Sequence, residues 1–171
     1  MDFAKSIKQA INIIKLDEKT ILDVSNDQSA TIPAILIILI AGIAMGIGSL
    51  NIISIFVLPF ILIILFSILS VIIHVIAKIL GGQGSLINYY RAAGHISIIN
   101  WISIIPIIGS LISMILSLWS LVVNVKVIKS VYKLSTIKAI TVLLIPVIAI
   151  TLLLILLIVP LVMWQLGAFN L

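Results

Sequence analysis

The residues best able to do chemistry in this chain are cationic and hydrogen-bonding side chains on either side of a glycine-rich stretch, residues 81–85. Two of them lie before the stretch, four positions apart. Three lie after it, at spacings of three and four positions. Each set therefore shares one helical face. No acidic residue occurs after Asp27 to neutralise them. Such a set predicts a small pocket for an anion, such as a lipid phosphate or an acidic group of a partner, formed by His74, Lys78, Asn88, Arg91 and His95.

A turn between two helices is needed to bring these two sets together. Glycines permit backbone angles that are closed to other residues, and a serine before a helix caps its free N–H groups. If the chain reverses here, the arginine and the first histidine lie at similar depths, about two turns into the helices. We then expect Arg91→Ala to reduce retention of an anionic lipid while leaving stability nearly unchanged. The turn residues are Gly81, Gly82, Gly84 and Ser85.

A simpler interpretation of the same residues stays open. An arginine close to a helix end can extend its side chain toward water, and a histidine can bond across helices. Tyr89 and Tyr90 are expected at interfacial depth, where amphipathic rings are favoured.

Composition places these elements in a bilayer. The 171 residues are 63% hydrophobic and 9% charged, whereas soluble domains are about 45–50% apolar and about 25% charged. All five acidic residues fall within the first 27 positions, and only basic charges follow. The sequence therefore predicts an all-α integral membrane protein, with a cytoplasmic head over 1–31 and a membrane domain over 32–171. With no cysteine, thiol chemistry is excluded and the redox compartment is undetermined.

Five membrane spans account best for the apolar runs. A span needs about 20 mainly apolar residues, and residues 92–125 are uncharged over a length that suits two spans. Pro106 and Gly109 predict a hairpin between them. The alternative of four spans would place Lys126 and the lysines after it outside, against the positive-inside bias. We therefore expect a cytoplasmic N-terminus, an outer C-terminus, and spans over 32–50, 52–79, 86–105, 109–128 and 138–165.

The head predicts a basic amphipathic helix. Phe3, Ile7, Ile11 and Ile14 recur at helical spacing, with lysines on the rest of the circumference. This apolar face suits the inner leaflet and equally suits packing against the protein's own cytoplasmic loops. Asp17 fits the N-cap of a short second helix.

Small residues within the spans predict helix packing. Gly42 and Gly46 lie four apart, which lets two backbones approach closely within the chain or in a dimer. Serines form one stripe with Ser67 and Ser70 in the second span and another in the fourth. The second stripe suits packing more than a lined cavity, at Ser113, Ser117 and Ser120.

Two stretches carry a resemblance to a known family. The segments "LGGQGSLINYYRAAGHISIINWISIIPIIG" and "LWSLVVNVKVIKSVYKLSTIKAITVLLIP" resemble the Yip (Ypt/Rab-interacting protein) domain family, most of all its prokaryotic branch. The resemblance implies a five-helix membrane domain with a cytoplasmic N-terminus, in a prokaryotic cell membrane. Eukaryotic relatives contact prenylated Rab GTPases, but this head lacks their "DLYGP" segment, so that role is not carried over.

Three function classes follow. The first is a non-enzymatic scaffold or adaptor whose basic cytoplasmic face engages anionic lipid headgroups or another membrane or peripheral protein. The second is a small transporter or lipid-handling protein with a polar intramembrane cavity. An enzyme is the weakest class, because the spans hold no carboxylate pair and no metal-ligand set. No catalytic residue, metal, cofactor or nucleic acid is predicted, and a homo-oligomer is compatible with the sequence.

Overall fold

The computed structural model describes residues 2–165, apart from the side chains of Ser110, Met163 and Trp164, and these residues form helices joined by short turns. Two short helices precede a series of long apolar ones. In chain order the elements are α1 (Phe3–Ile14), α2 (Glu18–Asn26), the 3₁₀ turn η1 (Gln28–Ala30), α3 (Thr31–Gly48), α4 (Ile52–Ile79), α5 (Leu86–Gly94), the 3₁₀ helix η2 (His95–Ile104), α6 (Ile108–Tyr132) and α7 (Thr136–Gln165).

Four helices are long and apolar enough to cross a membrane, which confirms the prediction of an all-helical membrane protein. The predicted number of five is not established in this way. The predicted third span is divided between α5 and η2, and neither part is long enough alone. The four candidate spans are Gln28–Gly48, Ile52–Ile79, Leu111–Tyr132 and Thr136–Val162.

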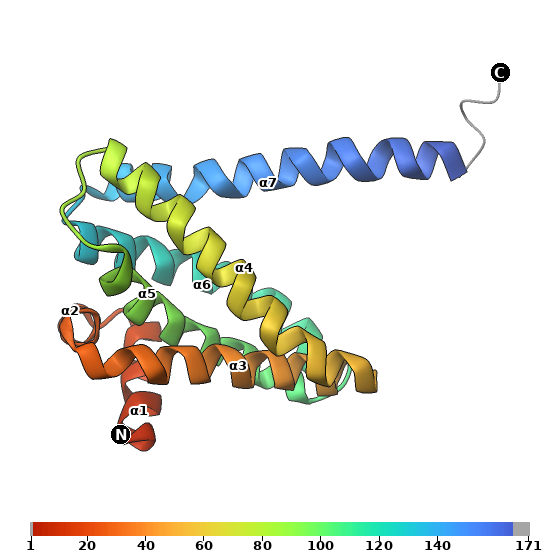
Figure 1. The fold of residues 1–171 in the computed structure, drawn as a ribbon, viewed down its shortest axis with the longest axis horizontal. Helices are drawn as coiled ribbons and strands as arrows, with labels where there is room; N and C mark the ends of the chain where they lie inside the picture. Colours follow the sequence, from red (N-terminus) through yellow and green to blue (C-terminus); the bar gives the residue numbers. More distant parts are fainter. Residues whose placement is uncertain (1, 166–171) are drawn as a thin grey trace.

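The long helices run back and forth along the molecule, so that several helix ends collect at one end (Figure 1). The starts of α3, α5 and α7 and the ends of α4 and α6 meet there. The N–H of Gln83 donates to the carbonyl of Tyr132, and Lys138 Nζ donates to the carbonyl of Leu80, at 2.9 Å each. We call this the basic end; it carries Lys78, Arg91, Lys126, Lys129, Lys133 and Lys138, together with the lysines of α1 and α2, Lys5, Lys8, Lys15 and Lys19.

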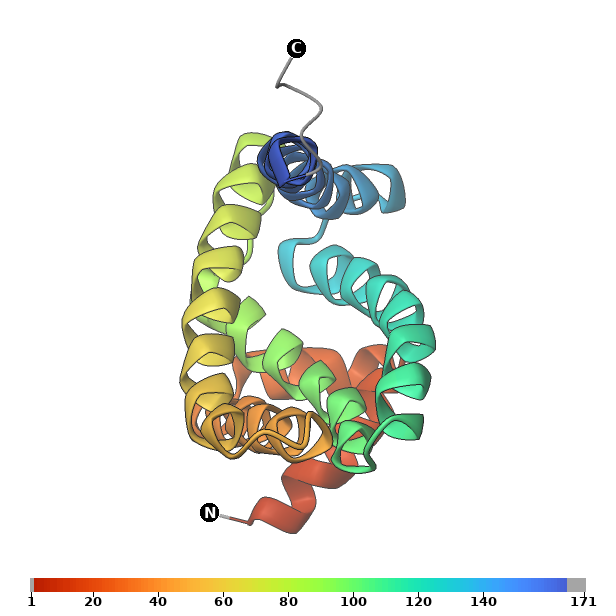
Figure 2. The same ribbon diagram turned by 90° about the vertical axis from the view of Figure 1, so that its right-hand side faces the viewer.

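α5 and η2 form the centre of the bundle. Viewed along its length, they run from beside α4 to the space between α3 and α6 (Figure 2). Tyr89, Ala92, Ala93, Ile96 and Ile99 are all buried. A 3₁₀-helix such as η2 has a larger rise per residue than an α-helix and poorer hydrogen-bond geometry. In this protein it occurs where other helices cover the backbone.

Glycines let the surrounding helices approach this centre and one another. Gly42 and Gly46 face α4 so closely that a Cβ at either position would overlap the backbone of Pro59 or Ile55. Gly48 lies against the Ser103 carbonyl of η2 in the same manner. The close approach at Gly42 and Gly46 thus lies within the chain.

The turn between η2 and α6 reverses the chain differently from the expected hairpin. Ile107, next to Pro106, adopts the positive φ of 63°, a conformation that is strained for a β-branched residue. Gly109 instead lies on α6, where a side chain would overlap the carbonyl of Ile102. Gly109 therefore allows α6 to pack closely against η2, and Ile107 adopts the backbone conformation of the turn.

The head packs on the bundle through a face rotated from the predicted one. α1 runs across the long axis in both views (Figures 1 and 2). Ser6, Ala10 and Ile13 are buried, whereas Ile11 is 44% exposed. The Phe3 ring stacks on Trp101 of η2, with centroids 6.5 Å apart. One edge of the apolar face therefore packs on the protein, and insertion of the exposed edge into the inner leaflet stays a prediction.

α2 is attached next to α1. The predicted N-cap is confirmed, since Asp17 accepts from the N–H of Lys19 at 3.1 Å and from the hydroxyl of Thr20 at 2.6 Å. Glu18 then forms an ion pair with Lys126 of α6. This pair fixes the start of α2 to the basic end.

Candidate functional site

Arg91 is held by protein groups on three helices. Its Nε donates to Thr31 Oγ1 at 2.8 Å, and one terminal nitrogen donates to the Ser25 carbonyl at 3.3 Å and to Asn88 Oδ1 at 3.5 Å. The side chain is 9% exposed. Because the Ser25 carbonyl belongs to the last turn of α2, the guanidinium closes that helix end and ties it to α3 and α5.

An acidic residue of the head lies near this arginine. Hydrogen bonds from Ser29 hold the pKa of Asp27 below its usual value, and the positive charges of Lys5 and Arg91 lower it further. The expectation that no carboxylate neutralises Arg91 considered only the membrane body, so it missed a carboxylate contributed by the head.

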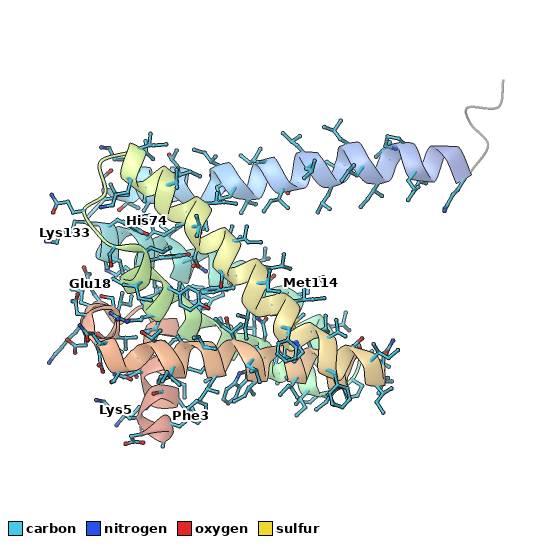
Figure 3. All side chains as sticks on the ribbon, viewed as in Figure 1. Phe3, Lys5, Glu18, His74, Met114 and Lys133 are labelled. Carbon is cyan, nitrogen blue, oxygen red and sulfur yellow. The ribbon has the colours of Figure 1, made fainter. Side chains whose placement is uncertain are left out.

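His74 belongs to a different group. Its Nδ1 lies 3.0 Å from the hydroxyl of Tyr132 at the end of α6, and the Tyr132 ring packs beside that of Tyr89. Figure 3 shows His74 on α4 and Glu18 in the head. The structure thus divides the predicted pocket: Asn88 and Arg91 face α2 and α3, while His74 pairs with α6.

His95 and Lys78 occupy the two extremes of exposure among the five residues. His95 is fully buried, and its Nδ1 lies 2.7 Å from the Arg91 carbonyl of the preceding turn. Its Nε2 has no hydrogen-bond partner among the described residues. Lys78 is exposed near the end of α4. Binding of an anion by these residues stays a prediction, and Arg91 would have to leave its protein partners to take part.

The turn borders a different polar recess, which the sequence did not reveal. Gly81 holds a φ of 89°, and Ser85 Oγ accepts from the N–H of Asn88 at 3.2 Å as α5 begins. Gly82 and Gly84 lie where a side chain would press on the ends of α4 and α6. The recess has a volume of about 370 Å³ and is lined by polar residues of the turn, α2, α5 and α6, among them Asn26, Gln83, Ser85, Asn88, Ser130 and Lys133.

The recess combines groups suited to an anion. The N-terminus of α5 points partial positive charge toward it, and Lys133 adds a full positive charge. The buried hydroxyl of Ser130 has no partner that meets hydrogen-bond geometry among the described residues, although it lies close enough to Glu18 to help lower that carboxyl's pKa. Lys126 is the main cause of that lowered pKa.

A second cavity lies within the bundle, between α4, α5, η2, α6 and α7, and encloses about 240 Å³. Tyr89 points into this interior, where its hydroxyl donates to Asn124 Oδ1 at 3.1 Å; the expectation that it lies at the interface was wrong. Tyr90 is half-buried beside Phe66. The polar lining residues are Ser70, Tyr89, Ser97, Asn100, Ser120 and Asn124.

The three packing serines of the fourth predicted span have three different environments. Ser113 Oγ lies 2.6 Å from Ser103 Oγ of η2, and Ser120 lines the cavity. Ser117 is exposed and donates to the Met114 carbonyl of its own helix, so it does not pack against another helix. The stripe winds around α6 and does not follow a single interface.

Comparison with known proteins identifies the family. Residues 19–158, most of the chain, match the Yip1 domain. No curated protein and no solved structure matches the chain. The matched region starts in α2 and runs through the long helices to α7. The chain therefore belongs to the Yip1 domain family.

Proposed function

We propose that this Yip1-domain membrane protein is a non-enzymatic scaffold or adaptor whose basic end lies on the cytoplasmic side and binds anionic lipid headgroups. The observation that carries the proposal is the position of α1. It lies across the basic end with Ile11 exposed beside Lys8 and Lys15, which are also exposed. An apolar edge bordered by lysines is the surface of a helix that rests in the headgroup layer.

We infer a fifth pass, formed by α5 and η2, which supports this orientation. α5 and η2 follow one another directly and together span about 33 Å at the rises of α- and 3₁₀-helices. That length matches the roughly 30 Å of bilayer hydrocarbon. With five passes, every lysine and arginine lies on the same side, in agreement with the positive-inside bias.

The recess beside the turn supplies a second contact for a headgroup. It lies at the same end as α1 and contains Lys133 and the N-terminus of α5. Figure 3 shows Lys133 at the outer edge of the basic end. A phosphate there would receive hydrogen bonds from donors that the protein leaves available.

The test compares lipid association of the full chain reconstituted in bilayers of phosphatidylcholine and phosphatidylglycerol. Spin-labelled phosphatidylglycerol should associate more strongly than spin-labelled phosphatidylcholine. Changing Lys5, Lys8 and Lys15 to glutamine should reduce the preference for phosphatidylglycerol over phosphatidylcholine severalfold at low salt. Each lysine near an anionic surface contributes up to about 1 kcal/mol. The gain from those lysines should shrink as salt is raised.

The matched control changes the same three lysines to arginine, which keeps the charge. Equal lipid preference in the glutamine and arginine variants would contradict the proposal. A stoichiometric protein that co-purifies through the basic end, without any preference for anionic lipid, would instead favour a protein adaptor.

A further inference from the structure

The cavity within the bundle has a mixed lining of apolar and uncharged polar side chains. Its hydrogen-bonding residues come from α4, α5, η2 and α6, and no lysine, arginine, histidine or carboxylate lines it. A polar group surrounded by hydrocarbon and protein must find a partner, since no bulk water is available. The cavity therefore suits a neutral molecule that forms hydrogen bonds.

Two side chains of η2 that line the cavity, Ser97 and Asn100, lack hydrogen-bond partners among the described residues. Most polar residues of the lining are already engaged: Ser70 and Ser120 donate to carbonyls of their own helices, and Asn124 pairs with Tyr89. The side chains of Ser97 and Asn100 form no hydrogen bond with any described residue. An unpaired carboxamide beside apolar walls is costly, so these two groups point to a polar ligand.

An apolar groove lies next to the cavity. It lies between α6 and α7, has a volume of about 390 Å³, and is lined by apolar side chains apart from Thr136. Leu121, Leu143 and Val147 line both the groove and the cavity. Pro146 borders the cavity and, lacking an N–H, cannot donate to the carbonyl of Val142. The polar and the apolar space therefore lie next to each other along Leu121, Leu143 and Val147.

We propose that this site binds an uncharged single-chain lipid, with its hydroxyl or ester group at Asn100 and Ser97 and its hydrocarbon chain in the groove between α6 and α7. A charged headgroup is disfavoured because the cavity offers no opposite charge. The basic end is not part of the site, so the proposal is independent of headgroup binding there.

The experiment uses the full chain in nanodiscs with two photoreactive probes of equal chain length. One is a monoacylglycerol carrying a diazirine in its acyl chain, and the other is the corresponding fatty acid, which is anionic at pH 8. Peptide mapping by mass spectrometry should find the monoacylglycerol attached within residues 121–125 and 140–147. The fatty acid should label these residues several times less.

Asn100→Leu should reduce labelling by the monoacylglycerol about fivefold, the effect expected for one lost buried hydrogen bond. Ser117→Leu is the matched control, because it also replaces a polar residue but lies on the exposed face of α6, and it should leave labelling unchanged. If Asn100→Leu lowers the yield of folded protein, Ser97→Phe provides a second test by filling the cavity, and it should also suppress labelling in 121–125 and 140–147.

Three outcomes would overturn the proposal. The first is equal labelling by the neutral and anionic probes. The second is labelling spread evenly over α4 and the last turns of α7, as for ordinary lipid contact. The third is a folded Asn100→Leu or Ser97→Phe variant that labels as the native chain does. Loss of headgroup preference in the lysine variants, with labelling intact, would affect only the proposed function.

Discussion

The segment Leu86–Ile104 and the second half of α7 differ in opposite ways from what their compositions suggest. The first contains tyrosine, arginine, histidine and asparagine, yet nearly half of its residues are buried and only Ile87 and Ile104 are exposed. The second is almost wholly aliphatic, yet every residue from Ile148 to Val162 is exposed. Figure 1 shows this part of α7 extending beyond the other helices. In this molecule the more polar segment forms the centre, and the most apolar one faces outward.

Backbone hydrogen bonding explains the difference. A regular α-helix satisfies its own N–H and C=O groups, so the second half of α7 needs only lipid around it. A 3₁₀ segment such as η2 bonds less well and must be covered by protein. Burial then allows polar side chains to bond between helices, as Arg91 and Tyr89 do.

The largest expected effect comes from adding a single methyl group beside η2. Gly48→Ala would place a Cβ into the Ser103 carbonyl, and because both groups belong to backbone, one helix must shift. We expect a loss of about 1–3 kcal/mol or more in stability, measured as a lower midpoint of thermal unfolding in detergent.

Ala149→Val, in the exposed part of α7, is the matched control. It adds methyl groups where only lipid is adjacent, so its midpoint should stay near that of the native chain. Equal destabilisation by the two variants would mean that the buried and exposed segments do not differ as described.

The second prediction concerns the arginine of the buried segment. Arg91→Ala removes hydrogen bonds to Thr31 and to the Ser25 carbonyl, leaving the end of α2 without its partner. We now expect a loss of about 1–3 kcal/mol, in place of the small change predicted from the sequence. Arg91→Lys should recover little, since an ammonium cannot reach several acceptors in one plane. Native stability in Arg91→Ala would return this residue to the anion-binding hypothesis.

The long apolar helices were predictable because lipid imposes a length and a composition on each span. The predicted second span ran over 52–79, and α4 spans Ile52–Ile79. Positions on a helical face were also predictable, since Asn88 and Arg91 do meet. The helix that this face contacts could not be predicted. The sequence suggested that Arg91 faces His74, whereas the head folds back and supplies Thr31 and Ser25 as partners.

The residues missed at the site were missed for two reasons. Asn100 and Ser97 sit in η2, where three residues complete a turn, so the α-helical spacing used to find polar stripes does not apply. Tyr89 was assigned to the interface by residue type alone, although its hydroxyl has a specific partner in Asn124. Contacts between segments far apart in the chain leave no local pattern.

A smaller effect should separate two adjacent tyrosines. Tyr89→Phe removes a 3.1 Å hydrogen bond to Asn124 from a buried ring, and we expect a loss of about 1 kcal/mol. Tyr90→Phe removes a hydrogen bond from Ser67 that is 3.4 Å long, and Ser67 also donates to the Ile63 carbonyl. Its unfolding midpoint should change less. The reverse order would contradict the assignment of Tyr89 to the interior.

The smallest effect is expected at the exposed ion pair between Glu18 and Lys126, which contrasts with the buried contacts of Arg91. The lysine holds the pKa of Glu18 below its usual value. A lowered folded-state pKa means that the pair stabilises the docked head at neutral pH, and that this contribution declines as pH falls below about 4.5 through the folded value. Because Glu18 is exposed and salt screens its attraction to Lys126, the change in stability should be small. Proteolysis between α2 and α3 is a suitable readout. Glu18→Gln should raise the cleavage rate slightly at pH 7 and reduce the difference between pH 7 and pH 4, while Asp17 and Asp27, whose pKa values are also lowered, keep the rest of that difference. A second variant, Asp23→Asn, neutralises another acidic residue of α2 and serves as the control. If Glu18→Gln and Asp23→Asn behave alike, the ion pair contributes nothing to docking, and α2 is held by its hydrogen bonds with Arg91 and Asn88 and by apolar packing.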